Sequence, residues 1–266
     1  MPRMEFFKTV IKASIRAGIC VALFLGAASS SPTAQGKTAN VTYVAMASNF
    51  TSAGKEIASA FEKKTGHRAL LSFGSTGKLY IQITNGAPFE VFLSADTQTA
   101  KKIEAVGLSI PGTRFTYALG KIALYSSDPD LIENNAEVLS NPAAFSRLAI
   151  ANPKTAPYGR AAVETLMKLG IYADVKDKIV KGSNIAQAFQ FVFTGNAQMG
   201  FAALSQVKNI SEGSNWIVPS HFYTPIKQDA ILLRRGETNP IASAFFKFLK
   251  SEKARRIIEK YGYDAN

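Results

Sequence analysis

Residues 71–83 read LSFGSTGKLYIQI, and this stretch predicts how the chain folds. The segment HRALLSF (67–73) is typical of a β-strand, and TGKLYIQITNG (76–86) has the length and spacing of a helix that ends at Asn85-Gly86. A turn of sequence GSTG (74–77), made of glycine and hydroxyl side chains, therefore connects a predicted strand to a predicted helix.

The same strand-then-helix unit occurs on either side of this stretch. Before it, VTYVAMAS (41–48) is strand-like, and residues 51–65 carry apolar side chains at helical spacing. After it, the strand-like EVFLSAD (90–96) precedes a helical pattern over residues 97–107. Repeated units of this length predict a parallel sheet with right-handed crossovers.

The second half of the chain repeats this alternation. Strand-like segments are 117–126, 147–152, 199–207 and 228–235, and helical patterns cover 158–169, 185–194 and 240–262. The chain has 266 residues, 47% of them hydrophobic, which is enough for one large domain or two small lobes. We predict an α/β fold of two doubly wound lobes, in which ligands bind at the carboxyl ends of the strands.

The N-terminal segment has the layout of a secretory signal peptide. Four basic residues precede the apolar run 19–28, and small polar residues follow it. A run of about ten apolar residues is too short to span a bilayer. We expect residues 1–34 to be removed on export, with Ala28 and Ala34 both acceptable at the cleavage site. Cys20 is the only cysteine and lies in this segment, so the mature chain has no disulfide or thiol chemistry.

Loss of residues 1–34 lowers the formal net charge from +12 to +9. An exported basic protein suits an anionic ligand or an anionic surface. The Lys and Arg residues are dispersed and no recognition motif occurs, so we expect no nucleic-acid partner. The two histidines, His67 and His221, have no partner nearby in the sequence, which argues against a catalytic triad or a metal cluster.

Four predicted strand-to-helix junctions offer hydroxyls and free backbone N–H groups without a carboxylate. They are residues 47–50 (ASNF), 74–77 (GSTG), 156–159 (APYG) and 182–185 (GSNI). The first turn of a helix has about four unpaired N–H groups and a partial positive charge, which suits an anion. Ordinary N-capping explains any one junction, but four of them together favour anion binding.

Two catalytic interpretations of GSTGK are weak. A phosphate-binding P-loop requires glycine where Ser72 stands and Ser or Thr where Leu79 stands. Ser75 and Lys78 match the S-x-x-K motif of serine acyl-enzymes, but the K-T-G at 64–66 precedes the serine and no S-D-N follows. A serine acyl-transferase using Ser75 and Lys78 stays a minor alternative, and we expect the protein not to be an enzyme.

Taken together, five segments resemble the periplasmic solute-binding proteins that deliver molybdate or tungstate to an ABC transporter. The segments are 45–67, 71–96, 148–166, 182–207 and 239–263, so the likeness covers nearly the whole mature chain. The resemblance implies the type II periplasmic binding protein fold, with a ligand cleft between two lobes. Lobe 1 would comprise residues 41–118 and 224–266, and lobe 2 residues 119–223. The crossovers near 118–121 and 223–227 would form the hinge.

The resemblance also implies which residues hold the anion. The matching positions are Ser48, Asn49, Ser75, Tyr158 and Ile185. The serines would donate through their hydroxyls, and Tyr158 and Ile185 through backbone N–H groups, so the contacts are to oxygens and not to the metal. Some members add a tyrosine hydroxyl where this chain has Ala203, and we expect Asn49 or Tyr158 to replace that donor.

The absence of Asp and Glu from the four junctions favours a fully ionised dianion over protonated phosphate, which benefits from an acceptor. This leaves molybdate, tungstate or sulfate as the ligand, and a sulfate receptor of the same fold stays open as an alternative. The resemblance implies a monomeric periplasmic protein that needs no cofactor. Its partners would be the small oxyanion and the membrane permease of an ABC transporter.

Overall fold

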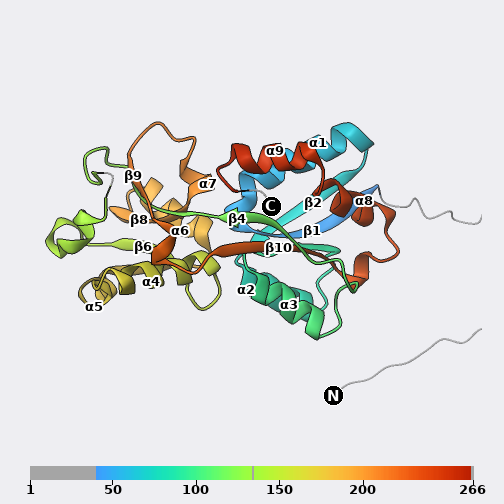
Figure 1. Ribbon diagram of the computed structural model, residues 1–266, viewed down its shortest axis with the longest axis horizontal. Helices are drawn as coiled ribbons and strands as arrows, with labels where there is room; N and C mark the ends of the chain where they lie inside the picture. The colour runs from blue at the N-terminus through green and yellow to red at the C-terminus, as the bar shows by residue number, and fades with distance from the viewer. Residues whose placement is uncertain (1–39, 134, 265–266) are drawn as a thin grey trace, which may run out of the picture. The chain divides into compact units, whose positions relative to one another are not determined.

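Two five-stranded sheets organise the chain (Figure 1). The computed structural model describes residues 40–133 and 135–264, so the predicted signal peptide and Cys20 lie outside the described residues. The strand orders are β2-β1-β3-β10-β4 in the first sheet and β7-β6-β8-β5-β9 in the second. Both sheets carry flanking helices, which confirms the predicted α/β class with two doubly wound lobes.

The first sheet is built from segments at both ends of the described chain. Its strands are β1 (Val41–Ala47), β2 (Arg68–Gly74), β3 (Val91–Leu93), β4 (Phe115–Gly120) and β10 (Ile226–Leu232). Its helices are α1 (Thr51–Thr65), α2 (Thr76–Thr84), α3 (Thr97–Ala105), α8 (Pro240–Phe248) and α9 (Glu252–Lys260). Helices α2 and α3 lie on one side of this sheet, and α1, α8 and α9 lie on the other (Figure 1).

The second sheet uses the middle of the chain. Its strands are β5 (Ile122–Ser126), β6 (Leu148–Ala151), β7 (Ile179–Gly182), β8 (Met199–Ala203) and β9 (Ser214–Ile217). The helices of this part are α4 (Pro157–Lys168), α5 (Tyr172–Val175), α6 (Ile185–Phe193) and α7 (Leu204–Val207). None of the helices in the described part of the chain is both long and apolar enough to cross a membrane.

Strand β1 shows how the core forms on both faces of the first sheet. Successive side chains of a strand point to opposite faces. Accordingly, Val44 and Met46 join one buried cluster with Phe61 of α1, whereas Ala45 between them joins another with Leu79 of α2. A strand that is covered on both faces is continuously apolar, which explains why VTYVAMA does not alternate with polar residues.

The parallel pairing predicted from the repeated strand-helix units holds for only part of each sheet. Strands β2, β1 and β3 are parallel, but β10 runs antiparallel to both β3 and β4. In the second sheet β5 is antiparallel to β8 and β9. Strand β4 carries the chain out of the first sheet toward the second, and β10 brings it back. Because the two strands run in opposite directions, they pair antiparallel.

Three element boundaries also differ from the sequence prediction. The single strand expected over 117–126 is two strands, β4 and β5, which belong to different sheets and are separated at Lys121. The strand expected over 199–207 ends at Ala203, and α7 follows it. The helix expected over 240–262 is two helices, because Ser251 caps α9 by accepting a hydrogen bond from the N–H of Ala254.

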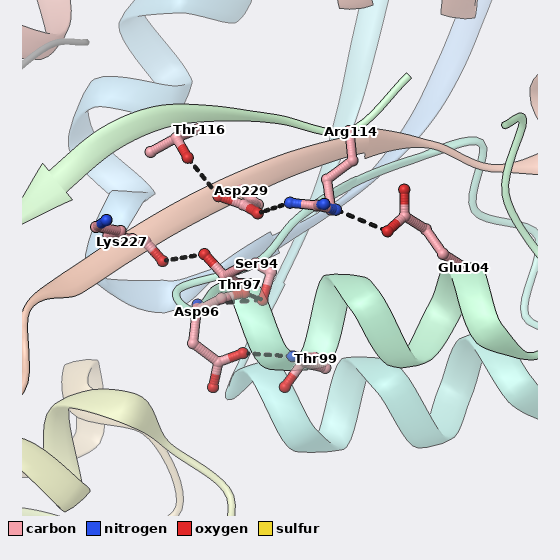
Figure 2. A network of polar contacts seen from close by, with 9 residues as sticks. All are labelled: Ser94, Asp96, Thr97, Thr99, Glu104, Arg114, Thr116, Lys227 and Asp229. Atoms are coloured by element: carbon pink, nitrogen blue, oxygen red, sulfur yellow. Dashed lines mark hydrogen bonds and ion pairs between the residues drawn. The ribbon is translucent and has the colours of Figure 1, made fainter. Parts of the chain in front are cut away.

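A buried carboxylate connects β10 to its neighbours in the first sheet. Figure 2 shows Asp229 between Arg114 and Thr116. Its oxygens accept hydrogen bonds from Nη1 of Arg114 at 2.8 Å and from Oγ1 of Thr116 at 2.8 Å, and the residue is 0% exposed. Glu104 of α3 accepts from Nε of Arg114 at 2.7 Å, and the two carboxylates raise the pKa of that guanidinium above its ordinary value. Without Arg114, the charge of Asp229 would be buried and unpaired.

We expect Arg114→Met to lower the free energy of unfolding by about 3 kcal/mol, because removing one partner of a buried pair leaves an uncompensated charge. Glu104→Gln is the control and should cost at most about 1 kcal/mol, because Glu104 is partly exposed. Urea unfolding followed by circular dichroism measures both changes. Equal losses in the two variants would contradict a special role for Asp229.

Candidate functional site

The four predicted junctions meet at one pocket that both sheets line. The pocket encloses about 190 Å³ of space, counting its open mouth. Its lining is Ala47, Ser48, Asn49, Gly74, Ser75, Thr76, Ala95, Ala156, Pro157, Tyr158 and Ile185. The structure therefore brings together all five residues predicted from the sequence, and none of the five is more than 4% exposed.

The register of each sheet explains why the junctions coincide. Ala47 of β1 lies opposite Gly74 of β2 in their parallel pairing, so Ser48 and Ser75 follow at the same edge of the first sheet. In the second sheet Ala151 of β6 lies opposite Gly182 of β7. The segments that precede α4 and α6 therefore leave the second sheet at one edge as well.

Ser75 has a hydroxyl without a partner. It is the N-cap of α2 in an extended conformation, the position at which a serine usually bonds the first turn, yet its side chain makes no capping bond. Its Oγ is buried and forms no hydrogen bond with any described residue. An unsatisfied buried hydroxyl costs about 1–3 kcal/mol, and because Ser75 lines the pocket its hydroxyl is available to donate to an anion there. The neighbouring Thr76 is different, because its Oγ1 accepts from the N–H of Ala95 at 3.0 Å.

The second sheet contributes backbone donors. Helix α4 begins at Pro157, which has no N–H, so Tyr158 offers the first free donor of that helix. Helix α6 begins at Ile185, and its N-cap Asn184 accepts from the N–H of Gln187 at 3.0 Å. This cap satisfies a later donor of the first turn and leaves the N–H of Ile185 available to the pocket.

The structure shows where Ala203 lies, and also where Asn49 and Tyr158 lie, the two residues expected to replace the tyrosine donor that is absent at position 203. Ala203 is buried at the end of β8 and does not line the pocket. The side chain of Asn49 is engaged elsewhere, since its Nδ2 donates to Oε1 of Gln228 at 2.7 Å and to the hydroxyl of Tyr263 at 3.0 Å. The hydroxyl of Tyr158 lies 3.5 Å from the same Nδ2. The side-chain amide of Asn49 is therefore already bonded away from an anion, and the hydroxyl of Tyr158 lies against that amide and Gln228.

The electrostatics of the pocket come from backbone dipoles. Neither a carboxylate nor a cationic side chain is among its lining residues. Arg160, one turn into α4, forms an ion pair with Asp96, whose other oxygen caps α3 by accepting from the N–H of Thr99 at 2.7 Å. Lys78 is exposed and forms no hydrogen bond with Ser75. The starts of α2, α4 and α6 thus provide the positive potential.

Contacts between the two sides close the pocket. The N–H of Gly77 on α2 donates to the carbonyl of Thr155 at 2.9 Å. A Cβ at position 77 would lie 3.1 Å from both Cα and O of Thr155, so only glycine allows this approach without displacement. Sequence reasoning noted Gly77 as part of the turn but missed its role in contacting Thr155. The second glycine of GSTG, directly at a helix start, is the signal that could have indicated it.

A metal-binding role finds no support in the described ranges 40–133 and 135–264. They contain no group of three or more His, Cys, Asp and Glu side chains that could hold an ion. The pocket itself offers hydroxyl and N–H donors, which bind the oxygens of an anion and not a cation.

Comparisons with known proteins agree with this geometry. A model of the family described as bacterial extracellular solute-binding protein matches residues 42–264. A molybdate-binding protein of Azotobacter vinelandii is 53% identical over 223 residues, which are 83% of this chain and 88% of that protein. A molybdate-binding protein of Rhodobacter capsulatus is 47% identical over 251 residues, or 94% and 96% of the two chains.

A solved structure gives the same result for the fold. The periplasmic molybdate-binding protein of Azotobacter vinelandii superimposes with a TM-score of 0.82 at 37% identity, covering 85% of this chain and 99% of that one. The resemblance stated from the sequence is confirmed at the level of family and fold. This chain belongs to the bacterial extracellular solute-binding protein family.

Proposed function

We propose that this protein captures molybdate in the pocket between its two sheets and delivers it to an ABC importer. The observation that carries the proposal is the buried hydroxyl of Ser75, which has no partner and lines a pocket without carboxylates. The names and the high identity of the two curated relatives supply the identity of the anion.

The pocket selects by charge state. Its candidate contacts are Ser48, Asn49, Ser75, Tyr158 and Ile185. A fully ionised dianion accepts from every donor, whereas a protonated anion must find an acceptor for its own O–H. No carboxylate lines the pocket, so the O–H of protonated phosphate could bond only a hydroxyl oxygen, and that hydroxyl would then be turned away from donating to the anion as the proposal requires.

Size decides between dianions of equal charge. Molybdate, tungstate and sulfate all present four acceptor oxygens, so hydrogen-bond donors alone do not separate them. A sulfate receptor is the alternative within the fold: the sulfate-binding protein SubI of Mycobacterium tuberculosis superimposes with a TM-score of 0.70. At 10% identity that likeness concerns the fold alone, so molybdate and tungstate remain the proposed ligands.

Binding involves closure of two lobes around the anion without chemistry on it. We assign residues 41–118 and 224–266 to lobe 1 and residues 119–223 to lobe 2, with the hinge at 118–121 and 223–227. The closed form would present the anion to the permease of the transporter from the periplasmic side. We propose that the protein acts there as a monomer, after export and loss of residues 1–34.

A serine acyl-transferase is the remaining alternative from another class. It would require Lys78 to activate Ser75, and the structure gives no hydrogen bond between them because the hydroxyl of Ser75 has no partner. An acylating probe that forms an adduct on Ser75 would favour the enzyme, because that mechanism passes through a covalent intermediate.

We predict one-to-one binding of molybdate and tungstate to the protein purified without residues 1–34. Isothermal titration with molybdate, tungstate, sulfate and phosphate in parallel is the measurement. Phosphate should bind much more weakly than molybdate, because the pocket lining has no carboxylate to accept its proton. Binding of sulfate in preference to molybdate would establish the alternative receptor.

Replacing Ser75 by Ala should raise the Kd for molybdate by roughly ten- to a hundredfold, because a hydrogen bond to a charged ligand contributes about 1.5–3 kcal/mol. The same change should not destabilise the ligand-free protein, because the hydroxyl has no internal partner. Ser72→Ala is the matched control on the preceding strand, where the side chain is exposed. Titration and thermal unfolding test both statements, and an unchanged Kd for Ser75→Ala would remove Ser75 from the site.

A further inference from the structure

A buried polar cluster lies directly behind the pocket and joins the two sheets. We propose that it is an interlobe network that holds the segments of Asn49 and Tyr158 together at the pocket and favours the closed form. The network consists of Asn49, Tyr158, Ser205, Gln228 and Tyr263. Gln228 and Tyr263 pack with the first sheet, and Ser205 lies on α7 beside the second.

The carbonyl of Asn49 is held from both sides. It accepts from Oγ of Ser205 at 2.9 Å and from the hydroxyl of Tyr263 at 2.7 Å. The two donors also contact each other at 2.8 Å. The carbonyl of Asn49 shares a rigid peptide plane with the N–H of Phe50, so these bonds fix the peptide that directly follows Ser48 and Asn49 at the pocket.

The side chain of Asn49 connects to the rest of the network. Its Nδ2 donates to Oε1 of Gln228 and lies within 3.5 Å of the hydroxyl of Tyr158. Nε2 of Gln228 donates to that same hydroxyl at 3.4 Å. Tyr158 thus has its backbone at the pocket and its hydroxyl in the network, so one residue spans both.

The hydroxyl of Tyr158 also lies against the point where the chain passes between the sheets. A Cβ added to Gly120, the last residue of β4, would lie 2.2 Å from it. Gly120 is followed by Lys121 and then by β5 of the other sheet. A glycine at this position leaves the space that the tyrosine hydroxyl fills, which ties the network to the proposed hinge.

The residues of the network are almost fully buried, so their hydrogen bonds are shielded from water. Asn49, Tyr158, Gln228 and Tyr263 are each at most 3% exposed. Burial raises the pKa of Tyr263 to about 12, so its hydroxyl stays a neutral donor at any physiological pH. If the sheets moved apart, Tyr158 and Ser205 would exchange their bonds to Asn49 for bonds to water, so each of these bonds favours the joined state by a modest amount.

The test compares three buried tyrosines. Tyr158→Phe and Tyr263→Phe each remove a hydroxyl that bonds across the two sheets. Tyr117→Phe is the control for a hydroxyl that reaches the network without crossing between the sheets: it bonds Oε1 of Gln228 at 3.2 Å and the carbonyl of Ser94 at 3.4 Å, both within the first sheet's part of the molecule. All three variants lose one buried hydroxyl, but only Tyr158→Phe and Tyr263→Phe lose bonds between the two sheets.

Two readouts separate the inference from the proposed function on which it rests. The first is the Kd and dissociation rate for molybdate. The second is the distance distribution between spin labels in the ligand-free protein, with one label on α1 (Lys63→Cys) and one on α4 (Met167→Cys), both exposed positions. The expected mature chain has no cysteine of its own, so the labels attach only there.

We expect Tyr158→Phe and Tyr263→Phe to raise the Kd about threefold to tenfold, mainly through faster dissociation, while Tyr117→Phe changes it less than about twofold. In the ligand-free protein the same two variants should shift the label distances from those of the wild type, and Tyr117→Phe should not. Indistinguishable label distances in all three variants would overturn the inference. Absence of molybdate binding by the wild type would instead overturn the proposed function, and the label distances would still decide whether the network sets closure.

Discussion

A buried dianion must be met by hydrogen-bond donors alone, and the rest of this structure follows from that constraint. Carboxylates are absent from the pocket lining, and the nearby Asp96 is occupied by Arg160 and the start of α3. Positive potential comes from the starts of three helices, which carry no net charge. An anion held this way would be bound by several neutral donors from both sides of the pocket, and it would lose half of them if the two sides separated.

The pairing register of the strands brings the hydrogen-bond donors to the same place. Parallel pairing places Ala47 opposite Gly74, and each strand ends one residue before a serine. Neither serine needs an unusual loop, since ordinary strand-to-helix turns bring both hydroxyls to one sheet edge. The corresponding edge of the second sheet supplies N–H groups from the starts of α4 and α6. Each sheet therefore provides only part of the donors that line the pocket. The approach of Gly77 to Thr155 then sets how tightly the halves meet.

Local patterns in the sequence predicted most of the fold and the four junctions at the pocket, and the family resemblance singled out individual residues within those junctions. The helix of residues 51–65 and the short helix after Ser75 follow from spacing and from glycine stops, which act within a few residues. The direction of β10 and the division of 117–126 between two sheets were not predictable this way, because they depend on partners far along the chain. The contacts of Tyr263 with Asn49 were missed for the same reason, since 214 residues separate them.

The position of β10 has a consequence for how the chain acquires its structure. Strand β3 pairs on one side with β1 and on the other with β10, which begins at Ile226. The first sheet therefore cannot be completed until nearly all of the polypeptide is available, although its opening strand starts at Val41. Such late, long-range pairing slows folding, so the first sheet stays open for longer after synthesis than a sheet built from neighbouring strands would.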